Sequence, residues 1–269
     1  MVDCQTLIRA SVEIKGISCY SKCVLLLGGY IMQFVQAQFS LKYEPQNRIR
    51  RSVNEIEDYL QEHYGTPQTI PVPDEFNPEV PRIVLYSKNG HSQISFSQIS
   101  VDFTVRFDND YLSDFSKTKK YINERLILVL EVLKKIGISE YLYCGLTYNS
   151  HIDIDTRSPI EYMKNYLGGS VPDEGLYEAS QNVAIVIDDY YFVNKTIGTY
   201  KEFKGIQGTI PILFDIQSMS IVSEGVSLAL DVNNRYHYIY SREKKTVDSC
   251  FAEIEKFFSL IDESISEWK

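Results

Sequence analysis

Three polar residues alternate with isoleucine in the segment His151-Ile152-Asp153-Ile154-Asp155. Alternate side chains of a β-strand point to the same face, so His151, Asp153 and Asp155 would lie together on one side of a sheet. An imidazole beside two carboxylates can hold a divalent metal ion or act as a base. The same alternation is typical of any strand with one face in water. The candidate catalytic and metal-ligating residues are therefore His151, Asp153 and Asp155, with a solvated strand face as the alternative.

A second set of acidic residues lies within or at the ends of expected strands. Its members are Asp188, Asp189, Asp215 and Asp231. Some metal-dependent nucleases combine a buried carboxylate pair with a Glu-x-Lys triplet, and two triplets occur here, Glu13-Ile14-Lys15 and Glu202-Phe203-Lys204. Such triplets are common by chance, and two-metal chemistry needs several converging carboxylates, which spacing alone does not show. This set is a weaker candidate than the His151 segment.

The motifs of other chemistries are absent from the sequence. It contains no Gly-x-Ser-x-Gly nucleophile elbow, no P-loop and no Gly-x-Gly-x-x-Gly. The pairs Gly28-Gly29 and Gly168-Gly169 are better explained by a turn and by a helix end. We therefore expect no bound cofactor, and neither ATP-driven nor nicotinamide chemistry.

Composition limits the location and the partners of the chain. The five cysteines are an odd number, and Cys19 and Cys23 have no second pair at metal-ligand spacing, so we expect reduced thiols in the cytoplasm. The most apolar run, residues 24–35, has 12 residues, whereas a membrane-spanning helix needs ~20. A net charge of −9 opposes binding to nucleic acid. The sequence predicts neither export, nor a membrane span, nor a nucleic-acid partner.

Four helices are expected from apolar residues at helical spacing. They are Ser52 to Tyr64, Ser116 to Ile136, Ser158 to Gly168 and Val247 to Trp268. In the third, Ser158 and Glu161 form a predicted capping box around Pro159 at the first helical position.

The remaining apolar residues alternate with polar ones, which is typical of strands rich in Val, Ile, Tyr and Phe. The expected strands are Leu7 to Ile14, Val24 to Gln38, Ile83 to Tyr86, Gln93 to Phe96, Val101 to Phe107, Tyr141 to Asp155, Val183 to Phe192, Ile210 to Ser220 and Val226 to Tyr240. Strands follow strands without regular alternation with helices. This order predicts an α+β fold, with largely antiparallel sheets and long helices packed on one face.

One tetrapeptide occurs twice in a similar context. Val72-Pro73-Asp74-Glu75 and Val171-Pro172-Asp173-Glu174 each follow a short helix and precede strands that lead into a long helix. This echo suggests an internal repeat of two sheet-plus-helix lobes. We place the N-terminal lobe at residues 1–156 and the C-terminal lobe at residues 157–269, with one continuous domain as the alternative.

Several short motifs resemble a sporadically distributed, uncharacterised bacterial family. Pro81-Arg82-Ile83-Val84-Leu85, followed by Gly90 and Ile94, resembles its Pro-Arg, strand, turn, strand passage. Ile138-Ser139-Glu140-Tyr141-Leu142 after the long helix resembles a second passage, although the arginine usual there is missing. A third is Leu230-Asp231-Val232-Asn233 before the terminal helix. The resemblance covers most of the chain after residue 70 and implies a two-lobed α+β fold with no established activity.

These observations favour a non-enzymatic function. The chain has 20 tyrosines, and tyrosine is enriched both on sheets and at protein interfaces. An exposed sheet edge accepts a partner strand. We therefore expect a protein-binding, adaptor or chaperone-like protein whose partner is another protein or a copy of itself. The alternatives are a metal-dependent hydrolase or nuclease component that uses His151, Asp153 and Asp155, and a self-associating structural protein whose terminal helix packs through Trp268.

Replacing Asp153 and Asp155 together by alanine separates binding from hydrolysis. Surface carboxylates contribute little to folding, so we expect the unfolding free energy to change by less than about 0.5 kcal/mol. A binding protein retains its partner in affinity purification. A metal-dependent hydrolase loses its bound metal and its activity, and that result would reverse our preference.

Overall fold

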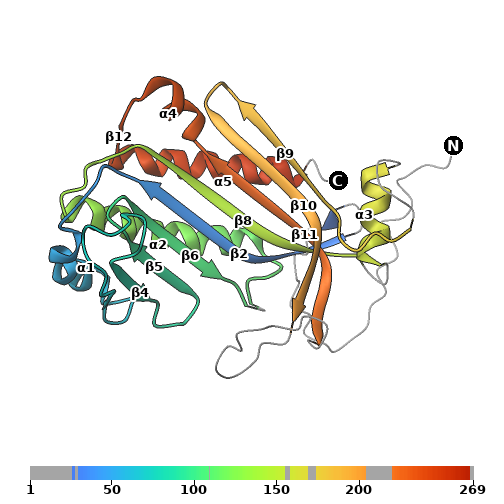
Figure 1. Cartoon of the computed structure of the whole chain (residues 1–269), viewed down its shortest axis with the longest axis horizontal. Coiled ribbons are helices and arrows are strands. Elements are labelled where there is room, and N and C mark those ends of the chain that lie inside the picture. The colour runs from blue at the N-terminus through green and yellow to red at the C-terminus, as the bar shows by residue number, and fades with distance from the viewer. Residues whose placement is uncertain are drawn as a thin grey trace, which may run out of the picture.

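The computed structural model describes residues 26–27, 30–108, 110–154, 158–168, 174–203 and 220–266. Its main feature is a ten-stranded sheet with every pairing antiparallel, in the order β3-β4-β5-β6-β2-β8-β11-β10-β9, with β1 paired to β2 (Figure 1). The strands are β1 Leu26–Leu27, β2 Tyr30–Lys42, β3 Gln68–Thr69, β4 Ile83–Tyr86, β5 Ser92–Phe96, β6 Ser100–Arg106, β8 Tyr143–Asp153, β9 Ser180–Ile187, β10 Tyr191–Phe203 and β11 Ile221–Asn233. A separate two-stranded sheet joins β7 (Glu140–Tyr141) to β12 (Lys245–Thr246). The predicted α+β class and the antiparallel sheet are confirmed.

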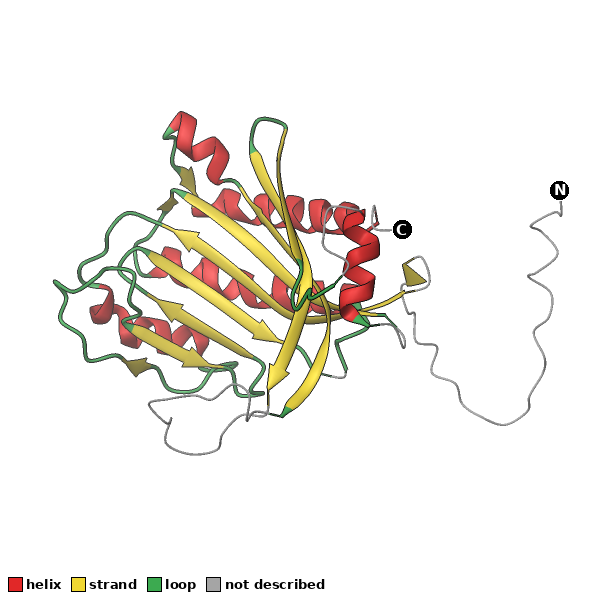
Figure 2. Cartoon of the chain, turned by 45° about the vertical axis from the view of Figure 1, so that its right-hand side comes forward, coloured by secondary structure: helices red, strands yellow, loops and turns green. Residues whose placement is uncertain are grey.

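The two long helices cover one face of the large sheet. The helices are η1 Ile49–Ser52, α1 Val53–Leu60, α2 Phe115–Lys135, α3 Pro159–Leu167, α4 Arg235–Ser241, η4 Val247–Ser249 and α5 Cys250–Ser266. Figure 2 shows α2 and α5 behind the strands, and no described helix crosses the front of the sheet. Asn123 of α2 donates a 2.7 Å hydrogen bond to Glu255 of α5, so the two helices lie side by side.

The alternation of side chains along the central strands explains why only one face is covered. On β8, Cys144, Leu146, Tyr148, Ser150 and Ile152 are buried, and the residues between them are half-buried. The buried set packs against the helices because apolar side chains gain free energy on leaving water.

An aromatic cluster at the centre of the covered face joins both long helices to the sheet. The ring of Phe34 on β2 lies 5.2 Å from that of Phe115 on α2. Tyr148 on β8 lies 6.2 Å from Phe258 on α5, and its hydroxyl donates to Thr118 Oγ1 at 3.2 Å. These contacts fix β2, β8, α2 and α5 relative to one another.

The two halves of the chain have a similar order of main elements, although α4, β12 and η4 stand between β11 and α5 in the second half. In the first, β2 is followed by α1, the meander β4-β5-β6 and then α2; in the second, β8 is followed by α3, the meander β9-β10-β11 and then α5. The strands β2 and β8 pair through eleven residue pairs and join the halves into one sheet. The predicted lobe boundary at residues 156–157 and the first three residues of the second tetrapeptide, 171–173, lie outside the described residues.

Two predicted strands differ from the structure. Val226 to Tyr240 was expected as one strand, but β11 ends at Asn233 and α4 follows. Asn234 is buried, and its Oδ1 accepts a 2.8 Å hydrogen bond from the backbone N–H of Cys144, which ends the ladder. Val183 to Phe192 was also expected as one strand, but it forms a hairpin turn because Asp188 and Asp189 have φ of 55° and 48°. Aspartate is one of the few residues that tolerate this left-handed region.

The ends of the helices differ in smaller ways. The second helix begins at Phe115, and Asp114 caps it by accepting from the Lys117 N–H at 2.9 Å. Pro159 opens α3 as predicted, but Ser158 makes no side-chain capping bond, so the capping box is not formed. The expected helix Ser52 to Tyr64 ends earlier, at Leu60. Trp268 and the predicted strands Leu7 to Ile14 and Ile210 to Ser220 lie outside the described residues.

None of the helices in the described residues is long and apolar enough to cross a membrane.

Truncating Phe39 to alanine tests whether the sheet is one cooperative unit. Phe39 lies in the middle of β2 and is fully buried, so we expect a loss of about 3–5 kcal/mol in the unfolding free energy. Because β2 pairs with strands of both halves, urea unfolding should remain a single transition with a lower midpoint. The control Tyr86→Ala removes a side chain that is 51% exposed and should change stability by less than about 0.5 kcal/mol. Two separate transitions would show that the halves fold independently.

Candidate functional site

The uncovered face of the sheet carries mostly amide and hydroxyl side chains. Strand pairing places Arg106 of β6 opposite Gln36 of β2, and Gln36 opposite Asn149 of β8. The next row contains Thr104, Gln38 and Thr147 in the same order. These rows form a polar surface on the side of the sheet opposite α2 and α5.

His151 lies on this uncovered face, as the sequence predicted from its alternation. Its ring stacks on the ring of Tyr200 from β10, with centroids 3.9 Å apart and planes at 17°. Gly225 of the intervening strand β11 makes the contact possible, because a Cβ there would lie 2.8 Å from Tyr200 Cε1. No sequence pattern indicates this partner, which lies 49 positions later and two strands away.

The environment of His151 favours its neutral form. Burial against Tyr200 and the neighbouring strands lowers the pKa of the imidazole below its usual 6.5, and the carboxylate of Glu202 opposes this shift. A neutral imidazole has one nitrogen that donates and one that accepts a hydrogen bond. His151 can therefore accept a proton or orient a polar ligand at neutral pH.

The structure describes only two of the three residues of the predicted metal site. Asp153 follows His151 on β8 and lies opposite Ile31, whereas Asp155 lies outside the described residues. Within the described residues, no group of three His, Cys, Asp or Glu side chains is placed to hold a metal ion. A metal site that includes Asp155 therefore stays a prediction.

The other predicted acidic residues are dispersed. Asp188 and Asp189 form the β9–β10 turn. Asp231 lies on the uncovered face, where it accepts hydrogen bonds from Thr147 (3.2 Å), Asn194 (2.8 Å) and Asn233 (3.1 Å). Glu202 lies near His151, and the remaining members, Asp215, Lys204 and the Glu13 triplet, are outside the described residues.

A hollow of about 450 Å³ opens beside the stacked rings. It is lined by Val35, Gln36, Arg106, Asn149, Ser150, His151, Tyr200, Lys201, Glu202 and Ser227. It thus brings together residues of β2, β6, β8, β10 and β11.

A buried carboxylate that the sequence did not single out holds the β9–β10 hairpin to α5. Glu253 accepts hydrogen bonds from the hydroxyls of Tyr190 (2.8 Å) and Tyr191 (3.0 Å) and forms an ion pair with Lys245. Tyr190 also stacks on His237 of α4, at 4.4 Å between ring centroids. These contacts fix the turn end of the hairpin.

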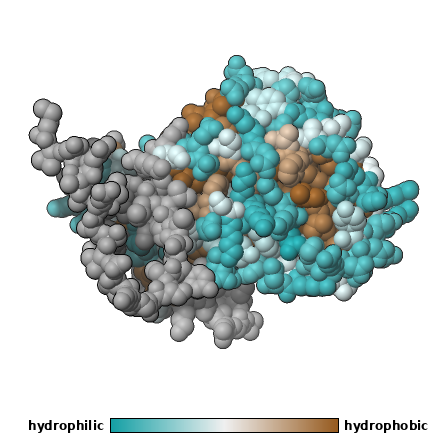
Figure 3. Space-filling view, turned by 180° about the vertical axis from the view of Figure 1, so that it is seen from behind, coloured by the Kyte–Doolittle hydropathy of each residue, from teal (hydrophilic) through white to brown (hydrophobic). Residues whose placement is uncertain are grey.

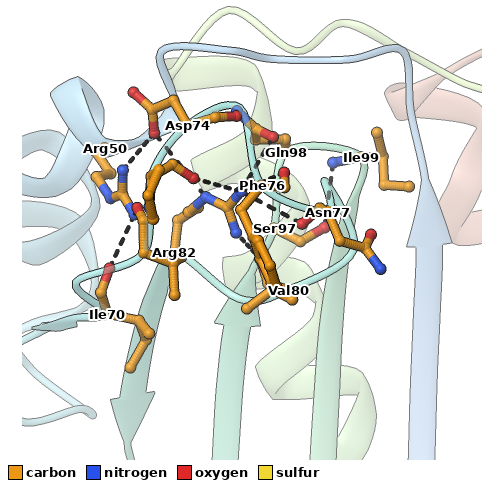
Figure 4. Close-up of polar contacts among 12 residues, drawn as sticks. Arg50, Ile70, Asp74, Phe76, Asn77, Val80, Arg82, Ser97, Gln98 and Ile99 are labelled. Carbon is orange, nitrogen blue, oxygen red and sulfur yellow. Dashed lines mark hydrogen bonds and ion pairs between the residues drawn. The ribbon is translucent and has the colours of Figure 1, made fainter.

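Arg82, from the Pro-Arg passage of the sequence, has a structural role. Its side chain is fully buried, and its guanidinium donates to the backbone carbonyls of Val80 (2.6 Å), Phe76 (3.1 Å), Pro73 and Asn77 (both 3.3 Å) (Figure 4). It therefore holds the loop that contains the first tetrapeptide against β4.

Two surfaces in the described part of the chain expose apolar side chains. On the edge strand β9, Val183, Ile185 and Val186 are 44%, 40% and 41% exposed. On the helix side, Ile127 and Phe251 line a groove of about 220 Å³ between α2 and α5. Figure 3, which views the helix side, shows apolar patches within a largely hydrophilic surface.

Comparison with known proteins found no matching family model and no matching curated protein.

A pH titration of His151 tests the stacked site. We expect its imidazole to titrate below 6.5 by NMR, because burial disfavours the charged form. The stabilisation that the folded state gains from a neutral His151 is therefore fully present above about pH 6.5. It is lost as the pH falls through the lowered pKa. Tyr200→Leu removes the stacked ring and should move the pKa toward 6.5. The distant control Tyr86→Leu should leave it unchanged, and an equal shift in both variants would refute a local effect of Tyr200.

Proposed function

We propose that this chain is a protein-binding module that takes up an extended segment of another protein along the free edge of β9. The observation that carries the proposal is the eight-residue strand β9 at the end of the sheet, which pairs only with β10 among the described residues. In the described part of the chain, its outward backbone N–H and C=O groups pair with no strand, and main-chain hydrogen bonds to an added strand supply the affinity in strand addition.

The composition of β9 supports this role. Natural edge strands are usually protected by charged residues, prolines or very short length. The sequence of β9, Ser180–Ile187, is SQNVAIVI, which contains neither a charge nor a proline. The opposite end of the sheet follows the protected pattern, because β3 has only two residues. The exposed apolar edge is therefore confined to one end of the sheet.

The attachment of β9 supports presentation of an ordered edge. The turn that joins β9 to β10 is held to α5 through Glu253, as described above. A strand that is already ordered loses less conformational entropy when a partner adds to it.

Charge favours a partner of different composition over a second copy. Each chain carries a net charge of −9, so two copies repel each other, whereas a basic or neutral apolar segment is attracted or tolerated. We therefore take the partner to be a non-acidic extended segment. Pairing of two copies through β9 is an outcome that the test below must distinguish.

Ile185→Lys tests strand addition at β9. The substitution places a charge in the apolar contact, and we expect the affinity for the partner to fall at least tenfold. Ile127→Lys is the matched control, because it adds the same charge at a similarly exposed isoleucine on α2. The measurement is recovery of stoichiometric partners from the native host by tagged wild-type and variant chains, followed by titration of the purified partner.

The outcomes separate the surfaces. Loss of the partner with Ile185→Lys alone supports β9, and loss with Ile127→Lys alone moves the interface to the α2–α5 groove and refutes the proposal. A dimer by light scattering that Ile185→Lys converts to a monomer would show that the occupant is a second copy.

A second candidate function is a metal-dependent hydrolase or nuclease component that uses His151, Asp153 and Asp155. One observation favours it: the surroundings of His151 keep its imidazole neutral, as a metal ligand or a general base requires. The double alanine variant described above tests it. The third candidate, a self-associating structural protein, is tested by the light-scattering measurement.

The origin and location of the chain are also proposals. The matching order of elements supports an internal repeat, and the anchoring role of Arg82 gives the Pro-Arg resemblance to the bacterial family a physical basis. A profile of relatives split between residues 156 and 157 would align its halves with each other if the repeat is real.

We also propose a cytoplasmic location. The sulfur atoms of Cys144 and Cys250 lie 3.8 Å apart and form no disulfide bond, which is consistent with a reducing compartment. Recovery of the chain outside the cytoplasm after fractionation of host cells would contradict this location.

A further inference from the structure

We propose that the hollow on the uncovered face of the sheet binds a small anionic ligand through its carboxylate or phosphate oxygens. The hollow lies between the row Arg106–Gln36–Asn149 and the stacked rings of His151 and Tyr200. It is separate from the outer edge of β9, so this inference does not rest on the proposed function.

The floor of the hollow is a row of hydrogen-bonding groups that have no partner among the described residues. Arg106, Gln36 and Asn149 lie directly opposite one another on β6, β2 and β8, with neighbouring strands ~4.8 Å apart. Their side chains make no hydrogen bond or ion pair with any part of the chain that the structure describes. By contrast, Asp231, one row away on β11, has three partners.

A bulge in β2 places this row. The pairing of β2 with β8 shifts register between Phe34 and Gln36, so Val35 is the extra residue. The carbonyl of Val35 accepts a 3.0 Å hydrogen bond from Phe107 N–H, which holds the bulge against the end of β6. Bulges commonly re-aim side chains next to functional sites. Here the bulge sets Gln36 between Arg106 and Asn149.

The chemistry of these groups favours an anion. A guanidinium can only donate hydrogen bonds, so its ligand must supply acceptor oxygens, and each amide can add up to two donors beside its own acceptor oxygen. Arginine is suited to planar or tetrahedral oxyanions because two of its N–H groups donate in parallel.

The charges of the residues that line the hollow also favour an anionic ligand. Among the described lining residues, Arg106 and Lys201 outnumber Glu202, and the lowered pKa of His151 favours its neutral form, so these residues sum to one positive charge on a molecule whose net charge is −9. Lys201 lies over the ring of Tyr177 at 3.6 Å, so Arg106 is the cation free to meet the ligand. Among the described residues that line the hollow, Glu202 is the only one with a carboxylate, which argues against a cation as the ligand.

The stacked rings provide the opposite wall. Tyr200 crosses Gly225 to reach His151, and its hydroxyl lies 3.3 Å from Ser223 Oγ. The two rings form an ordered, half-buried surface beside the polar floor. A ligand with an oxyanion on a small carbon or ring framework would contact Arg106 and the amides at one end and the rings at the other.

The test uses inorganic phosphate and succinate as probes of the full-length chain. Isothermal titration is performed at constant ionic strength, with chloride as the balancing anion. We expect saturable binding of at least one probe, and Arg106→Gln should raise its Kd at least tenfold. The control Arg51→Gln removes an exposed arginine from η1 and should leave the Kd unchanged. Circular dichroism confirms that both variants are folded, which is expected because both side chains are exposed.

Binding of phosphate alone would assign a phosphorylated ligand, and binding of succinate alone would assign a carboxylate. Absence of saturable binding of both probes at millimolar concentration would overturn the inference. So would equal weakening by Arg106→Gln and Arg51→Gln, because that result would reflect general attraction of anions. A loss of partner binding in Ile185→Lys with phosphate or succinate affinity intact would show that the two sites are independent.

Discussion

The antiparallel pairing of β2 with β8 is the constraint on which the rest of the structure depends. Each of these strands carries a helix-facing set of buried side chains, and each pairs on its other edge with a strand of its own half. Because the pairing extends over eleven residue pairs on both sides of the bulge at Val35, it fixes the register of the whole sheet and aligns α2 with α5 behind it. A slip of β2 by one residue would turn Phe39 toward water and bring Gln38 into the core.

The same pairing assembles the polar surface. Arg106, Gln36 and Asn149 come from three strands that are distant in sequence, and they share a row only because β2 lies between β6 and β8. The two faces therefore have a common cause: alternation sends apolar side chains to the helices and leaves amides, hydroxyls and one free arginine on the other side. Arg106, Gln36 and Asn149 have no distinctive sequence context, and they form the proposed anion site only because their strands lie side by side.

Local features of the fold were predictable from the sequence, and long-range ones were not. Residues that are neighbours in the sequence carry the apolar stripe of α2, the proline at the start of α3 and the alternation of β8. The bounds of these elements were therefore predicted within a few positions. The helix α4 was missed because the buried Asn234 bonds to Cys144, 90 residues away, and this contact overrides the strand pattern. The left-handed pair Asp188–Asp189 was missed because its neighbours are strongly strand-forming.

The candidate site divides in the same way. Alternation alone placed His151 on an uncovered face, but the pattern held no information on Tyr200, Gly225 or Arg106, which depend on strand order. Arg82 was noticed only as part of a short motif, and its bonds to four carbonyls are visible only after the loop before β4 is closed around it.

The position of β8 in the sheet has a consequence during synthesis. The ribosome adds about 5–20 residues per second, and roughly 100 residues separate the end of β2 from the start of β8. For several seconds the nascent chain can complete the meander β4-β5-β6 on one side of β2, while the other side of β2 has no strand to pair with. Phe39 and Leu41 lie along that side. An unfinished chain therefore exposes an unpaired strand edge beside apolar side chains, and the finished sheet buries this edge at its centre. Crowded polysomes, where identical unfinished edges lie close together, are thus the setting in which this fold is most exposed to misassembly.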